Sequence, residues 1–136
     1  MIRRFDVSDL EGIIEIENKS FPKSPYDKEA ILVYSAIYSD SFLVYEEEGN
    51  ILGYAIFEPS GHVISIAVDP GHRRKRIGTV LMKKALEKLK TAWIEVRSSN
   101  LIAQRFYEGL GFKKKGLVKN YYRPDDGLIM VYERND

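Results

Sequence analysis

The sequence predicts an α/β (α+β) protein in which one mixed β-sheet is flanked by helices. Two observations support this fold class. Short apolar runs typical of strands alternate with longer segments of helical periodicity, and Gly, Pro and Asn mark the turns between them. The chain has 136 residues, of which 44% are hydrophobic and 30% charged, so we expect a single domain over 1–136 with one core.

The first part of the chain is expected to form two helices separated by a loop. Ser8 precedes an apolar pattern and Glu11 follows three residues later, which is the spacing of a capping box, so we expect a helix over 8–18 with Ser8 as its N-cap. The segment 20–25 contains two prolines, which are incompatible with a regular helix interior. A second helix is expected over 27–38.

Three strands are expected next. Apolar segments over 42–46 and 51–58 flank Gly49–Asn50, which predicts a hairpin with its turn at those two residues. The segment 59–61 contains Pro and Gly and predicts a second tight turn, which leads into a strand over 62–68.

The second half alternates helices and strands. Apolar residues at helical spacing predict a helix over 77–90, and a further helix over 100–110 ends at Gly111, a residue type favoured at helix C-termini. The remaining strands are expected over 92–97, 112–118 and 128–133.

Composition excludes several kinds of site and partner. The chain contains no cysteine, which excludes disulfides, thiolate metal ligands and cysteine nucleophiles. Its two histidines are isolated in the sequence, so we expect no metal site. The apolar runs are far shorter than a membrane span, and the net charge of +1 argues against bulk binding to nucleic acid. We therefore expect a cytoplasmic protein with no membrane and no nucleic-acid partner.

The most informative segment is a basic loop over 68–79, which lies between an expected strand and an expected helix. Its sequence is Val68-Asp69-Pro70-Gly71-His72-Arg73-Arg74-Lys75-Arg76-Ile77-Gly78-Thr79. A helix N-terminus presents unpaired N–H groups and a partial positive charge, and both attract anions. Four consecutive cationic side chains over 73–76 strengthen that field. The pattern indicates a pyrophosphate-bearing cofactor; the alternatives are a solvated basic face and a nucleic-acid site.

A second motif covers 95–112 and reads Glu95-Val96-Arg97-Ser98-Ser99-Asn100-Leu101-Ile102-Ala103-Gln104-Arg105-Phe106-Tyr107-Glu108-Gly109-Leu110-Gly111-Phe112. Together with the basic loop it resembles the GNAT acyl-CoA N-acyltransferase family. The resemblance is to the RimI-type branch, which acetylates protein N-termini, including ribosomal-protein alanine. It extends from Glu17 to Met130, and its further marks are Phe21-Pro22 to Tyr26, and Tyr121-Tyr122 before Asp126. It implies the GNAT fold, with a single mixed, mostly antiparallel sheet of about six to seven strands and about four helices.

The resemblance implies acetyl-CoA as cosubstrate, without a metal. The pantetheine arm is expected along one strand and the pyrophosphate on backbone N–H groups of the basic loop. The implied contacts are Ile66, Ala67, Val68, Arg73, Arg74, Lys75, Arg76, Ile77, Gly78, Thr79, Asn100 and Tyr107. One position departs from the family pattern Arg/Gln-x-x-Gly-x-Gly/Ala, because Arg76 stands where glycine is usual. Glycine is favoured at such a position because the backbone must approach the phosphate closely or must adopt a positive φ. With arginine there, the loop is either a working site with an extra cation or a weakened cofactor site.

The resemblance also assigns the proton transfers, with Glu95 as general base and Tyr107 as general acid. Alternation along 92–97 places Trp93, Glu95 and Arg97 on one strand face. Each assignment has a structural alternative: Glu95 pairs with Arg97 or another cation, and Tyr107 is a core residue on an apolar helix face. Asn100 is also the expected N-cap of its helix.

The acceptor is expected to be the N-terminal α-amine of a protein or peptide. Such an amine has a reference pKa of roughly 7.7–8.0, against about 10.4 for lysine, and is easier to deprotonate near neutrality. Phe21, Tyr26, Tyr121 and Tyr122 are expected to form the walls of the acceptor-binding groove, with ordinary packing as the alternative.

Since no cysteine can carry an acyl group, the reaction is expected to proceed by direct attack in a ternary complex. The protein is expected to be a monomer or a weak homodimer. The alternatives are a lysine or small-molecule amine acceptor, and a non-catalytic acyl-CoA sensor.

Overall fold

The computed structural model describes residues 1–134, and of Arg74 the backbone only. The chain divides into two compact units. The first unit contains residues 1–59 and 63–88, and the second contains residues 60–62 and the chain from 89 onward.

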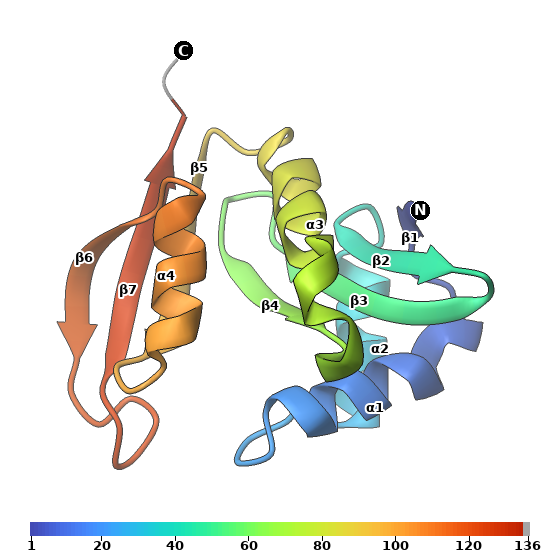
Figure 1. Ribbon diagram of the computed structural model, residues 1–136, viewed down its shortest axis with the longest axis horizontal. Helices are drawn as coiled ribbons and strands as arrows, with labels where there is room; N and C mark the ends of the chain where they lie inside the picture. The colour runs from blue at the N-terminus through green and yellow to red at the C-terminus, as the bar shows by residue number, and fades with distance from the viewer. Residues whose placement is uncertain (135–136) are drawn as a thin grey trace. The chain divides into compact units, whose positions relative to one another are not determined.

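The first unit contains a four-stranded antiparallel sheet with the strand order β1-β2-β3-β4 (Figure 1). Its elements in chain order are β1 (Ile2–Arg4), the 3-10 helix η1 (Val7–Asp9), α1 (Leu10–Ser20), α2 (Lys28–Ile37), β2 (Phe42–Glu47), β3 (Asn50–Phe57), β4 (Val63–Val68), the 3-10 helix η2 (Pro70–Lys75) and α3 (Ile77–Leu86).

Helices cover both faces of this sheet. Tyr54 of β3 lies in a core cluster with Ile13 of α1 and Ile31 of α2, and all three are fully buried. The preceding residue, Gly53, points to the opposite face. A Cβ there would lie 3.1 Å from Ile77 Cγ2, so α3 packs directly against the backbone of β3. The close fit of α3 on the sheet fixes where the N-terminus of that helix lies relative to the end of β4.

The second unit contains a three-stranded antiparallel sheet with the order β5-β7-β6. Its elements are β5 (Thr91–Arg97), α4 (Leu101–Gly109), β6 (Lys113–Val118) and β7 (Gly127–Glu133). Helix α4 packs through aromatic rings. The centroid of Tyr107 lies 5.6 Å from that of Phe112, which lies 5.6 Å from that of Tyr132 on β7. This packing holds the C-terminal part of α4 against the sheet.

The α/β fold class is confirmed, with four α-helices and seven strands among residues 1–134, but the expectation of a single sheet is corrected. The strands form two separate antiparallel sheets. Between residues 1 and 134, His62 and Trp93 form an isolated parallel bridge rather than a further ladder. Gly61 has a φ of 122°, and a Cβ there would collide with the Thr91 carbonyl. Apolar patterns identify strands, but they contain little information about which distant strands pair.

Three local expectations are also corrected. Ser8 is not an N-cap. Asp6 caps the 3-10 helix η1, where its carboxylate accepts the Ser8 N–H at 3.0 Å, and α1 starts only at Leu10 with Asp9 as its N-cap. The hairpin turn is Glu48–Gly49 rather than Gly49–Asn50, since those two residues have the positive φ values (52° and 80°) that a two-residue turn requires. The helix expected over 77–90 ends at Leu86.

Candidate active site

The N-terminus of α3 follows the basic loop as expected, and the backbone conformation of Arg76 explains why glycine is usual at this position. Arg76 lies between η2 and α3 with φ 61° and ψ 21°, the left-handed conformation. Glycine adopts this conformation without the steric cost that a Cβ brings. The positive φ, one of the two reasons considered for a glycine here, is therefore present, and an arginine occupies it.

The first turn of α3 has the donor set of an anion site. No side chain among the described residues caps it, and it contains no acidic residue. The amides of Ile77, Gly78 and Thr79 come before the first intrahelical donor, Val80, whose N–H donates to the Arg76 carbonyl at 3.1 Å. Lys75 and Arg76 are exposed cations next to these amides. Unpaired N–H groups at a helix N-terminus, with exposed cations beside them, fit a phosphate group.

Strand β4 leads into this site. Ile66 and Ala67 are buried, and Val68 pairs with Gly53 of β3. Because β4 is an edge strand of its sheet, one side of its backbone carries N–H and C=O groups that β3 does not use. Asp69 shapes the turn that follows, since its carboxylate accepts the Gly71 N–H at 3.1 Å. Sequence reasoning did not single out Asp69 for this role, although an Asp before Pro-Gly is a turn signal.

In the second unit, Glu95 lies on the half-buried face of β5. Trp93, Glu95 and Arg97 share this face as predicted, and the alternate residues are buried. The Glu95 carboxylate lies 2.9 Å from His62 Nε2, and the His62 ring stacks on Trp93 with centroids 5.6 Å apart. His62 is thus the partner of Glu95, in place of the Arg97 pairing that the structural alternative named. Sequence reasoning dismissed it as isolated, because its contact with Glu95 spans 33 residues.

Tyr107 is a buried residue of α4, with 7% of its surface exposed. Burial, with a smaller contribution from Tyr122, raises the pKa of Tyr107 well above its usual value. Its hydroxyl therefore carries a proton throughout the physiological pH range. Asn100 caps the helix as predicted, because its side chain accepts the Ala103 N–H at 3.1 Å. Tyr107 thus combines the packing expected of a core residue with the proton expected of an acid.

Gln104 was not predicted as a site residue. It is 3% exposed, and its amide donates to the carbonyls of Arg97 and Ser98 at 3.3 and 3.0 Å. It therefore holds the end of β5 against α4. The sequence signal for this role is a glutamine one turn after the helix N-cap Asn100.

The predicted acceptor residues fall into two pairs. Phe21 and Tyr26 belong to the first unit, where the Tyr26 ring packs edge-on against Tyr34 at 5.3 Å. Tyr121 and Tyr122 belong to the second unit, where their rings form a T-shaped contact at 4.9 Å.

The second pair is electrostatically coupled to Glu95. Burial and the charge of Glu95 raise the pKa of Tyr122 to about 12, and the same two causes raise the pKa of Tyr121. Arg97 lies over the Tyr122 ring at 4.5 Å and pairs with Asp125 at 3.3 Å. Glu95, Tyr107, Tyr121 and Tyr122 therefore form one group within the second unit.

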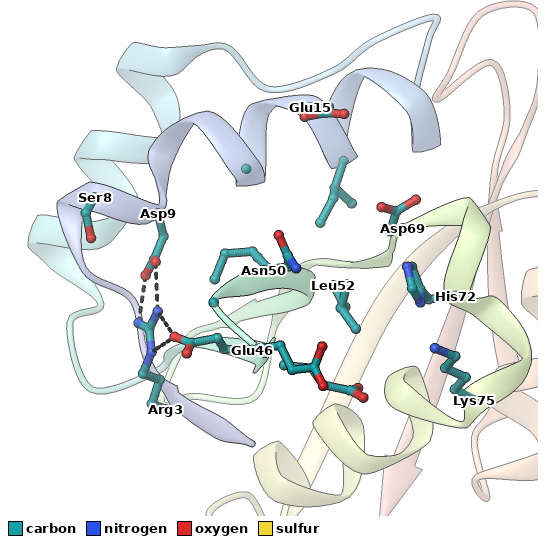
Figure 2. Close-up of a pocket in the computed structure, with 16 residues that line it drawn as sticks. Arg3, Ser8, Asp9, Glu15, Glu46, Asn50, Leu52, Asp69, His72 and Lys75 are labelled. Carbon is teal, nitrogen blue, oxygen red and sulfur yellow. Dashed lines mark hydrogen bonds and ion pairs between the residues drawn. The ribbon is translucent and has the colours of Figure 1, made fainter.

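The first unit also contains a pocket of about 710 Å³ between α1, the β2–β3 turn and η2 (Figure 2). Lys75 is a predicted site residue that lines it. Arg3 donates to the carboxylates of Asp9 and Glu46 in one wall, at 2.8 and 2.6 Å. The pocket was not anticipated from the sequence.

Among residues 1–134, no group of three or more His, Asp or Glu side chains could hold a metal ion. None of the helices in that part of the chain has the length and apolar character needed to cross a membrane.

Comparison with known proteins identifies the family. The sequence profile of the acetyltransferase (GNAT) family matches residues 10–112. The chain is 33% identical to an uncharacterised N-acetyltransferase of Methanocaldococcus jannaschii, over 98% of this chain and 92% of that protein. It is 32% identical to the ribosomal protein bS18-alanine N-acetyltransferase of Haemophilus ducreyi, over 93% of this chain and 92% of that protein. The crystal structure of Ard1 from Thermoplasma volcanium superimposes with a TM-score of 0.92 at 27% identity, covering 100% of this chain and 98% of that one. The chain therefore belongs to the GNAT family of N-acetyltransferases.

Proposed function

We propose that this N-acetyltransferase uses acetyl-CoA to acetylate the N-terminal α-amine of a protein or peptide in the cytoplasm, by direct attack in a ternary complex. One observation carries the proposal: the first turn of α3 presents uncapped amides beside exposed cations. The name of the Haemophilus ducreyi relative, which specifies an alanine of ribosomal protein bS18, supports a protein N-terminus as acceptor.

The cosubstrate would be held mainly by backbone. The amides of Ile77, Gly78 and Thr79 would bind the diphosphate, with the cations of 73–76 near the outer phosphates. The free edge of β4 over 66–68 would hydrogen-bond the pantetheine arm, with Asn100 and Tyr107 as further contacts. Acetyl-CoA supplies the acetyl group as an activated thioester. Because the donors are main-chain groups, the loop tolerates Arg76 as long as the left-handed turn forms.

Glu95 would accept the proton that the attacking amine loses. Roughly a tenth of an α-amine is already neutral at pH 7, whereas a lysine amine is almost entirely charged. A carboxylate acting through water is therefore sufficient for an α-amine. The hydrogen bond with His62 would orient the Glu95 carboxylate. His62 is thereby a positioning residue for the base.

Tyr107 would stabilise the sulfur of CoA as it leaves. A thiol has a reference pKa of about 8.5, and burial raises the pKa of Tyr107 well above that value. The phenol therefore always holds its proton, while full transfer to the thiolate is uphill. We expect Tyr107 to act chiefly by donating a hydrogen bond as negative charge develops on sulfur.

Acceptor profiling tests the proposal. Purified protein is assayed with acetyl-CoA against short peptides varied at their first three positions, each made with either the α-amine or the lysines blocked. We expect acetylation of peptides with a free α-amine, whether or not lysine is blocked. Turnover confined to lysines or small amines would contradict the α-amine assignment, and acetyl-CoA binding without turnover on any acceptor would favour the sensor.

A further inference from the structure

Glu17 is a buried carboxylate that the proposed reaction does not use. It lies in the last turn of α1, is 1% exposed, and adjoins the apolar cluster of the first unit. An acidic side chain is rarely buried to this degree unless hydrogen bonds replace its hydration. Its partners therefore indicate why a carboxylate stands there.

Its hydrogen bonds connect a loop to a sheet. Oε1 accepts from the hydroxyls of Tyr54 on β3 and Ser65 on β4, the latter at 3.1 Å. Oε2 accepts the backbone N–H of Tyr26 at 2.9 Å. The backbone carbonyl of Glu17 accepts the N–H of Phe21 at 2.8 Å. The bond from Phe21 closes the last turn of α1, and the Glu17 side chain holds the other end of the loop 21–26 at Tyr26. Those two ends are the two proposed acceptor residues of the first unit.

The two hydroxyl partners of Glu17 lie next to the segment 66–68 of β4, which is proposed to bind the pantetheine arm. Ser65 directly precedes Ile66, and Tyr54 pairs with Ala67 in the β3–β4 register. Glu17 therefore links the loop that would meet the acceptor to the strand that would hold the thioester arm. An apolar side chain could fill the same space without the cost of burying a charge, but it could not bind the Tyr26 amide.

We propose that Glu17 is a positioning residue that fixes the loop 21–26 for acceptor binding. This inference rests on the proposed function, because it takes Phe21 and Tyr26 as acceptor contacts. It assigns Glu17 a role in acceptor affinity but not in affinity for acetyl-CoA.

Kinetics of three variants test the role. In Glu17→Met the side-chain hydrogen bonds to Tyr26, Tyr54 and Ser65 are lost at similar side-chain length. We expect the acceptor-peptide KM to rise by about tenfold, with the acetyl-CoA KM within about twofold. Glu17→Gln should keep a near wild-type acceptor KM, because its amide can accept from Tyr26 and donate to a hydroxyl oxygen. Ile13→Val is the control, since it removes one methylene from the same helix and core but leaves the side-chain hydrogen bonds of Glu17 in place. An acceptor KM in Glu17→Met no higher than in the control, or equal rises in both KM values, would overturn the proposal.

Hydrogen exchange at the Tyr26 amide provides a readout that needs no activity. In the wild type this amide should exchange as slowly as the core amides of α1, and in Glu17→Met it should exchange at least tenfold faster. Fast exchange in the wild type would overturn the proposal even if Glu17→Met fails to fold. If the wild type acetylates no peptide, the proposed function fails, whereas exchange at Tyr26 still decides whether Glu17 holds the loop.

Discussion

Replacing Arg76 with glycine tests whether the left-handed conformation at this position carries a steric cost. A left-handed conformation costs a residue with a Cβ about 1 to 2 kcal/mol, which Arg76→Gly would remove. Glycine in turn loses about 0.5 to 1 kcal/mol through its greater freedom in the unfolded chain. The difference predicts that the free energy of unfolding rises by up to about 1.5 kcal/mol.

The same variant distinguishes a working cofactor site from a weakened one. Arg76 is exposed, so its loss should weaken acetyl-CoA binding by less than about fivefold, and less still at high salt. Chemical denaturation measures the stability change, and calorimetry at two ionic strengths measures the binding change.

Arg76→Ala is the matched control, because it removes the charge but keeps the Cβ. Its binding should change as in Arg76→Gly, and its stability should not rise. A glycine variant less stable than the wild type would refute the backbone argument. Much tighter acetyl-CoA binding by Arg76→Gly would show that arginine weakens the site.

The remaining predictions concern proton transfer and acid stability. Tyr107→Phe keeps the ring and removes the hydroxyl, so kcat should fall by about 100-fold with acetyl-CoA affinity within about twofold; an unchanged kcat at saturating peptide and acetyl-CoA rejects the role. Glu95→Gln should lose rate most at low pH, where the α-amine depends most on a base, and a pH–rate profile parallel to that of the wild type would assign the proton to another group. The hydrogen bonds from Arg3 lower the pKa of Asp9, so their stabilisation is present above about pH 4 and is lost as the pH falls through the folded-state value. Asp9→Asn should therefore cost about 2 kcal/mol of unfolding free energy at pH 7 and much less near pH 2, and a pH-independent difference in denaturation midpoints would contradict this.

Local patterns predicted most of the secondary structure. Alternation placed Trp93, Glu95 and Arg97 on one face of β5, and the Asn100 side chain caps α4. These features depend on a few neighbouring residues, so the sequence contains the information directly. The N-cap at Asp6 was missed because Ser8, two residues later, satisfies the same pattern.

Contacts between distant residues were not predictable in the same way. Glu95 pairs with His62 across 33 residues, and Glu17 meets Ser65 across 48. Both pairs depend on how strands are arranged, which periodicity does not specify. The separation of the strands into two sheets has the same origin. The resemblance located the candidate residues Glu95 and Tyr107, but only the folded chain identifies the partners that set their properties.

The most direct test of the central claim is the change in amide chemical shifts when CoA is added to isotopically labelled protein. Binding of the diphosphate at the N-terminus of α3 predicts that the amide protons of Ile77, Gly78 and Thr79 shift downfield more than any others. Pantetheine, which lacks phosphates, should leave these three amides unchanged. Tight binding of CoA with shifts confined to other parts of the chain, or no binding of CoA at all, would contradict the account.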